Sequence, residues 1–168
     1  MTITGKLTQP GGTLYIDGGQ LSVAGEYRLQ TLRTDGTDSY SSGYLKMINA
    51  ADYVLVGGNF VTQCYSTQTG YMTAGVLELK GNFTQNYAYN NYVFNPSGTH
   101  KVILSGTTTQ TVTFASAAAG ASRFNILEIH NLTNSINLNS SIFVNNFSLQ
   151  TNLLINGDLT FTGGTIDL

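Results

Sequence analysis

The sequence has few charged residues and almost no cysteine. Charged side chains make up 10% of the 168 residues, well below the roughly 25% of an average soluble domain. The net charge of −2 and the absence of any lysine- or arginine-rich run argue against nucleic acid as a partner. The single cysteine, Cys64, excludes an internal disulfide. No apolar stretch reaches the roughly 20 residues of a membrane-spanning helix, so we expect no membrane insertion.

Glycine, asparagine, threonine and serine fill the polar positions instead, and tyrosine and phenylalanine are the aromatic residues, with no tryptophan. These residues favour strands and turns. Short runs of alternating apolar and polar residues are separated by glycine pairs, as in half-buried strands joined by tight turns. No amphipathic helix of any length can be drawn. The sequence therefore predicts an all-β fold.

One phrase recurs along the chain: an apolar alternation, a glycine, a small polar residue, an aromatic residue or leucine, and a glutamine. Its clearest copies are residues 54–63 and 76–85, and weaker copies lie at 3–9, 23–30, 143–150 and 154–161. Such repetition is typical of stacked repeat folds. We predict one parallel β-solenoid domain over residues 1–168, a right-handed β-helix of roughly seven or eight coils. Residues 31–43 and 86–100 are expected to be two polar loop excursions.

The repeat predicts which side chains lie above one another. Phe60, Phe83 and Phe147 occupy the matching inward position and should form an aromatic row in the core. Asn59 and Asn82 occupy equivalent turn positions and should form a ladder of side-chain amides. Glu78 alternates with buried leucines and should face outward.

Neither end of the sequence shows a charged helix or polar cap, which free solenoids need to protect their open edges. Residues 1–6 already have strand character, so no signal peptide is expected. Residues 163–168 match residues 11–17, so the sequence stops within a phrase that it has used before. We expect either a segment of a longer array, paired with neighbouring repeats of the same chain, or a unit that associates with itself end to end.

The phrases at residues 51–60, 81–85 and 97–106, with the strands at 110–114 and 124–129, resemble tandem β-solenoid repeat modules of very large exported bacterial surface proteins of the Gram-positive type. The resemblance covers roughly residues 10 to 130. It implies an extracellular or cell-surface location and a structural or adhesive role, as a spacer or fibre-forming subunit. It implies no catalytic residues.

Candidate residues for chemistry are scattered. The carboxylates at positions 17, 52, 78, 128, 158 and 167 are isolated in sequence and are expected to be solvated, whereas β-helical polysaccharide-cleaving enzymes gather theirs on one face. His100 and His130 lie at no metal-ligand spacing, and His100 is expected to be exposed. Nothing near Cys64 in sequence would lower the pKa of its thiol. We therefore expect no enzyme activity, no cofactor and no metal.

Tyrosines in polar surroundings give an alternative function. Tyr87, Tyr89 and Tyr92 lie in the second excursion among asparagines, where exposed rings could stack on sugars in a carbohydrate-binding adhesin. Packing of these rings over the flank of the solenoid is the competing interpretation. An ice-binding protein is disfavoured because Thr-x-Thr motifs occur at residues 2–4, 111–113 and 160–162 but not at a common position in successive repeats. A polysaccharide-active enzyme is likewise the weaker reading.

Overall fold

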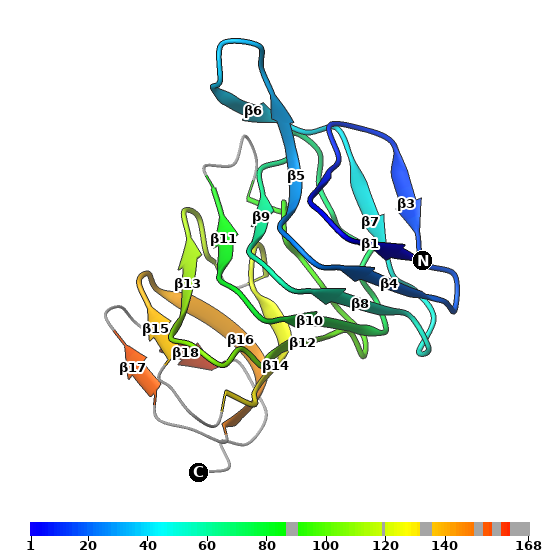
Figure 1. Cartoon of the computed structure of the whole chain (residues 1–168). Helices are drawn as coiled ribbons and strands as arrows, with labels where there is room; N and C mark the ends of the chain where they lie inside the picture. Colours follow the sequence, from blue (N-terminus) through cyan, green and yellow to red (C-terminus); the bar gives the residue numbers. More distant parts are fainter. Residues whose placement is uncertain (87–90, 119, 132–135, 150–152, 156–158, 162–168) are drawn as a thin grey trace.

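The computed structural model describes residues 1–86, 91–118, 120–131, 136–149, 153–155 and 159–161, as backbone alone beyond residue 145. Its described residues form strands and no helix, and almost all strand pairs are parallel (Figure 1). The predictions of an all-β fold and of parallel pairing are confirmed.

Eight strands form the first sheet, sheet A, in the order β1 (Thr2–Ile3), β4 (Gln20–Val23), β8 (Tyr53–Val56), β10 (Val76–Leu79), β12 (Lys101–Leu104), β14 (Phe124–Ile129), β16 (Ile142–Leu149) and β18 (Leu159–Phe161). The second, sheet B, runs in the order β17 (Leu153–Ile155), β15 (Ile136–Leu138), β13 (Gln110–Phe114), β11 (Phe83–Gln85), β9 (Phe60–Thr62), β5 (Tyr27–Leu32) and β2 (Leu7–Thr8). A third, sheet C, pairs β3 (Thr13–Tyr15) with β7 (Tyr44–Lys46).

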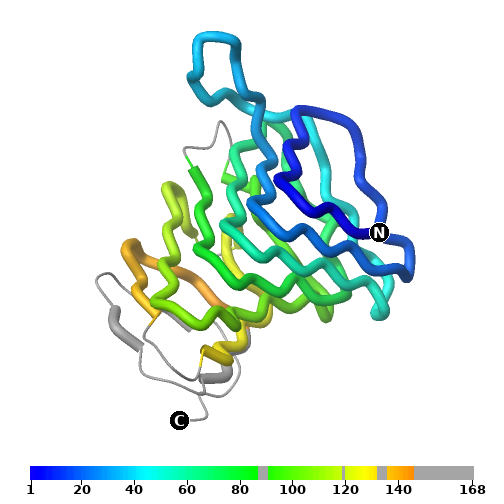
Figure 2. The backbone as a smooth tube through the Cα atoms, in the orientation of Figure 1, coloured from blue at the N-terminus to red at the C-terminus, as the bar shows by residue number. Residues whose placement is uncertain are grey.

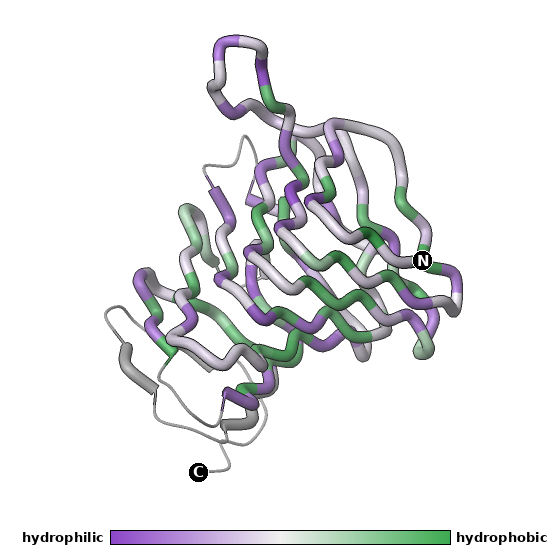
Figure 3. Tube along the Cα trace, in the orientation of Figure 1, coloured by the Kyte–Doolittle hydropathy of each residue, from purple (hydrophilic) through white to green (hydrophobic). Residues whose placement is uncertain are grey.

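From β8 onward the chain visits sheets A and B in turn, and each visit adds a strand to the growing edge (Figure 2). Strands β8, β10 and β12 alternate half-buried and buried side chains, which is the period-2 pattern of a sheet with one face on the core. Hydrophobic residues recur along these strands in Figure 3. One buried row across sheet A contains, in strand order, Val23, Val56, Leu79, Leu104 and Ile129.

The glycine of the repeated phrase is required by close backbone approach. Gly58 and Gly81 follow β8 and β10 at the same corner, and a Cβ atom on Gly81 would lie 2.5 Å from the Gly58 carbonyl. The asparagines that follow form a ladder, but its bonds run from side chain to backbone. Asn59 Oδ1 accepts from the Asn82 N–H at 2.9 Å, and Asn82 Oδ1 accepts from the Thr111 N–H at 2.8 Å. The expected alignment is confirmed, with backbone amides as the donors.

The aromatic row is confirmed for two of its three predicted members. Phe60 and Phe83 are paired in sheet B, and their ring centroids lie 5.9 Å apart with planes 16° from parallel. Phe147 is not in this row: it lies on β16 in sheet A opposite Leu127, and Val112 takes the place next to Phe83. Residues 142–149 contain no glycine that could turn the corner, so they form one long strand and not two short ones.

The two expected excursions differ from each other. In the first excursion, the last residues of β5 pair antiparallel with β6 (Asp38–Tyr40). This hairpin projects from the sheets (Figure 1). The second excursion is only partly polar surface, because Val93 and Phe94 are fully buried and Phe94 packs between Phe60 and Phe124. These two nonpolar side chains are buried although most of their neighbours in sequence are polar, so the polar composition of the segment did not predict their position.

Candidate functional site

The tyrosines proposed to contact a ligand lie in and beside the second excursion. Tyr87 and Tyr89 are outside the described residues. Tyr92 lies in a turn with 44% of its surface exposed. The structure therefore places one of the three at the surface and brings no second predicted site residue to it within the described part of the chain.

Other tyrosines outside the core use their rings to contact one another. Tyr44 and Tyr71 stack with centroids 4.3 Å apart and planes 19° from parallel, and Tyr40 packs on Tyr65 at 4.7 Å. A sugar ring stacks on an open aromatic face, and a face covered by a neighbouring ring offers none. These pairs join successive layers of the fold through ring contacts.

Glu78 faces outward from β10, as predicted, but it is enclosed by partners. Its carboxylate accepts hydrogen bonds from the Tyr53 and Ser105 hydroxyls, both at 2.5 Å, and pairs with Lys80 at 2.9 Å. Burial raises the pKa of Glu78, but these donors outweigh it and lower the pKa to about 2. A carboxylate held ionised in this way cannot act as a general acid near neutral pH.

Glu128 lies on the same outer face, in the same row as Glu78, with Ile103 on the strand between them. Its carboxylate pairs with Lys101 Nζ at 2.5 Å and contacts His130 Nε2 at 3.3 Å. Each carboxylate thus has its own basic partner, in contrast to the facing pair that glycoside hydrolysis uses.

Asp52 was expected to be solvated, and this was wrong: its side chain is 1% exposed. It precedes β8 and accepts hydrogen bonds from the N–H groups of Gly18 (2.5 Å), Ile48 (2.8 Å) and Asn49 (3.0 Å). The carboxylate therefore closes a turn, as an anion bound by three backbone donors. Sequence gave no signal for this, because Gly18 lies far away along the chain.

His100 was expected to be exposed, and it is fully buried. It occupies, before β12, the position that Asp52 occupies before β8, so its ring is covered by the layers on either side. His100 Nδ1 lies 3.0 Å from the Ala74 carbonyl oxygen, and Nε2 has no hydrogen-bond partner. Burial lowers the pKa of His100 to about 4, against the opposing effects of the Ala74 carbonyl and Asp52.

Cys64 is also fully buried, and burial raises the pKa of its thiol. Its Sγ lies 3.5 Å from Thr62 Oγ1, with no basic side chain among its hydrogen-bond partners. Hydrogen bonds from the Thr62 side chain and the Gln63 backbone lower this pKa, which the sequence-based expectation did not include, but burial outweighs them.

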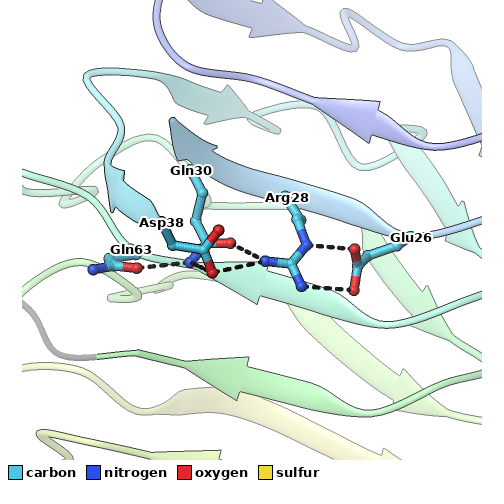
Figure 4. A network of polar contacts seen from close by, with 5 residues as sticks. All are labelled: Glu26, Arg28, Gln30, Asp38 and Gln63. Carbon is cyan, nitrogen blue, oxygen red and sulfur yellow. Dashed lines mark hydrogen bonds and ion pairs between the residues drawn. The ribbon is translucent and has the colours of Figure 1, made fainter. Parts of the chain in front are cut away.

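A polar network at the base of the hairpin was not predicted (Figure 4). Arg28 on β5 binds both carboxylate oxygens of Glu26 and reaches Asp38 at 3.2 Å. It also donates to Gln30 at 2.5 Å, and Gln30 in turn donates to Gln63 on the next layer at 2.6 Å. The hydrogen bond to Glu26 is the largest contribution raising the Arg28 pKa. The network fixes β6 against sheet B and leaves no free carboxylate among its members.

Apolar side chains reach the surface at the end of the molecule formed by β1, β2 and β3. Ile3, Leu7, Leu14 and Ile16 are only half-buried there, although they continue the core. Two open hollows lie at this end, one of about 270 Å³ between β2 and β3 and one of about 280 Å³ beside Tyr15. We call this surface the β1–β3 end face.

No group of three or more histidine, cysteine, aspartate or glutamate side chains that could hold a metal ion occurs in the described part of the chain. Among the same residues, no helix is long and apolar enough to cross a membrane. No protein-family model, curated protein sequence or solved structure matches the chain.

Proposed function

We propose that the chain is a non-enzymatic structural module that acts as a spacer or fibre-forming subunit and extends by pairing of strands at its ends. Its fold in this proposal is a right-handed parallel β-solenoid of roughly seven or eight coils. The right hand follows from the strong preference of parallel strand crossovers for that hand. An extracellular or cell-surface location is part of the proposal and rests on the resemblance of the repeated phrases.

The observation that carries the proposal is the order of strands in the two large sheets. Sheet A ends in β1 on one side and β18 on the other, and sheet B ends in β2 and β17. Both ends therefore present parallel strands that pair on one side only within the described residues. Each further layer could repeat the same pairing, so length is added without a new kind of contact.

Side-chain contacts among the described residues join neighbouring strands and should help a spacer or fibre subunit to resist mechanical force. The outer faces of β10 and β14 hold their carboxylates in ion pairs, and the tyrosine pairs bridge successive layers. Neighbouring layers are joined by a row of backbone hydrogen bonds in each large sheet, and each bond contributes about 1 kcal/mol, so the bonds of one row resist separation together. The carbohydrate-binding alternative gains less support from these pairs, because each of their rings has one face covered by its partner.

The proposal is tested by sedimentation velocity and negative-stain electron microscopy of the purified chain over a concentration series. Filaments of uniform width, growing in length with concentration, are expected. A monomer at every concentration would contradict self-association and leave pairing with neighbouring repeats of one longer chain as the surviving form of the spacer proposal. In that case, a glycan-binding screen of the wild-type chain beside a Tyr92→Ala variant would test the alternative.

A further inference from the structure

The hydrogen bonds of β1 and β2 show which backbone groups face outward at the β1–β3 end face. In a parallel pair, alternate residues direct both N–H and C=O to the same neighbour. The Ile3 carbonyl accepts a hydrogen bond from the next layer, so the N–H and C=O of Thr2 point away from it. The amides of Leu7 and Gln9 donate to the next layer, so the backbone groups of Thr8 point outward.

The same alternation holds for β3 in sheet C. The Gly12 carbonyl and the Ile16 amide bond to β7, which leaves the backbone groups of Thr13 and Tyr15 facing outward. Tyr15 is 59% exposed, and Lys46 Nζ covers one ring face at 4.7 Å. All three sheets thus end in a short ladder of outward donors and acceptors around a half-buried apolar centre.

The three edge strands are only two or three residues long, and two features with which proteins protect an open edge, charged residues and proline, are absent from them. Such edges are usually blocked by charged residues, proline or a bulge on the strand itself. Strands β1, β2 and β3 carry neither charge nor proline: Lys6 lies between β1 and β2, and Pro10 lies between β2 and β3. An edge of this composition accepts another strand.

We propose that the β1–β3 end face binds the opposite end of a second copy of this chain, the end formed by β17 and β18, in a head-to-tail arrangement. This inference rests on the proposed function and names its contact surface. Because sheets A and B are parallel throughout, the β17–β18 end offers strands of the same direction, and joining unlike ends generates an open filament and not a closed dimer. The outward amide of Thr8 is one donor of this junction.

Thr8→Pro tests the junction without removing a hydrogen bond inside the molecule. Proline lacks the N–H that points outward, and its ring occupies the space of an incoming strand. Thr8→Val, which keeps the amide, is the matched control. In sedimentation velocity, we expect wild type and Thr8→Val to assemble alike and Thr8→Pro to need about tenfold more protein, the effect of one lost hydrogen bond. Circular dichroism checks that the variant is folded, and Thr8→Lys replaces it if not.

Each result separates the contact surface from the wider proposal. Assembly of folded Thr8→Pro, or of Thr8→Lys where it replaces Thr8→Pro, at wild-type concentrations would overturn the β1–β3 end face while leaving fibre formation intact. A discrete dimer of the wild type would overturn the head-to-tail arrangement. A wild type that stays monomeric would overturn both the contact surface and self-association. In a head-to-tail filament, Thr8→Pro added at one part in ten should also shorten wild-type filaments, because its intact β17–β18 end still adds to a growing end.

Discussion

The chain turns at two corners, one before and one after each strand of sheet A, and different polar residues bind backbone groups at the two corners. The corner after sheet A turns the chain from β8 to β9 and from β10 to β11 with the same Gly-Asn pair, at Gly58-Asn59 and Gly81-Asn82. The corner before sheet A uses Asp52 before β8, His100 before β12 and, at the register-equivalent position within β14, Asn125. In both, side-chain polar atoms meet backbone groups of neighbouring layers, but Asn59 is exposed and Asn82 half-buried, whereas the residues of the corner before sheet A are buried. The corner after sheet A repeats its residues after β8 and β10, whereas the corner before sheet A has a different residue at each of the three positions named.

From this difference we infer that residues at the corner before sheet A contribute more to stability than those at the corner after it. At the corner after sheet A, each asparagine satisfies one backbone N–H of the next layer, and the loss of one affects one bond. At the corner before sheet A, Asp52 is a buried anion with three backbone donors, and His100 is a buried imidazole held neutral. Buried charge and buried titratable groups have larger energetic consequences than neutral amides.

The largest effect is expected at Asp52. Asp52→Ala would leave three backbone N–H groups at a buried turn without their acceptor, so we expect the free energy of unfolding to fall by about 4 kcal/mol. Asp52→Asn, which keeps one acceptor oxygen, should lose about half as much. Urea denaturation measures both. An Asp52→Ala variant as stable as Asn82→Ala would show that the two corners contribute alike.

The two corners also mark how far the sequence could predict the structure. Phe60, Phe83 and the aligned asparagines could be predicted because the same residue recurs at the same point of a phrase. The burial of Asp52 and His100 could not, because the residues at this corner differ from layer to layer and the separation between equivalent positions changes along the chain. Phe147 was misplaced because a similar phrase without its glycine continues as one strand.

In the candidate site too, features that follow from the sequence pattern could be predicted, and contacts between different layers could not. The outward direction of Glu78 could be predicted from alternation, but its partners Tyr53 and Ser105 come from other layers and leave no pattern in the sequence. Strands β1, β2 and β3 are edge strands of the three sheets. Which backbone groups those edges expose required the hydrogen bonds of β1, β2 and β3.

The second largest effect is a loss of stability at acidic pH, which we expect from His100. Its pKa is about 4 in the folded protein and about 6.5 when unfolded, so the folded state binds fewer protons between these values. Stability is therefore complete above pH 6.5 and falls as the pH drops toward 4, by about 2 kcal/mol at pH 5. Glu78, with a lowered pKa of about 2, adds a further loss only below its ordinary pKa of 4.5.

Urea denaturation at pH 7 and pH 5 measures this effect. His100→Asn, which places before β12 the residue found at the register-equivalent position of β14, should be less stable than wild type at pH 7 but should show a smaller difference between the two pH values. His130→Asn is the control, because His130 is partly exposed beside Glu128 and its removal should leave the acid effect of His100 in place. An undiminished pH dependence in His100→Asn would assign the acid effect to another group.

The smallest effect is expected at the corner after sheet A. Asn82→Ala removes the acceptor for the Thr111 N–H, and we expect the free energy of unfolding to fall by about 1 kcal/mol, as for the loss of one hydrogen bond. Asn82→Asp keeps an acceptor oxygen and should retain most of that stability. Thermal unfolding of the three proteins at pH 7 makes the comparison. A loss as large as that of Asp52→Ala would contradict the account of this corner as a set of independent single bonds.

In the proposed filament, strands stack along one axis and continue across the junction between molecules. X-ray diffraction from aligned assemblies of the wild-type chain tests it directly. Strands that lie across the filament and pair along it should give a meridional reflection at about 4.8 Å. That reflection on the equator, or its absence from well-aligned filaments, would mean that molecules join by their flanks and would contradict end-to-end strand pairing.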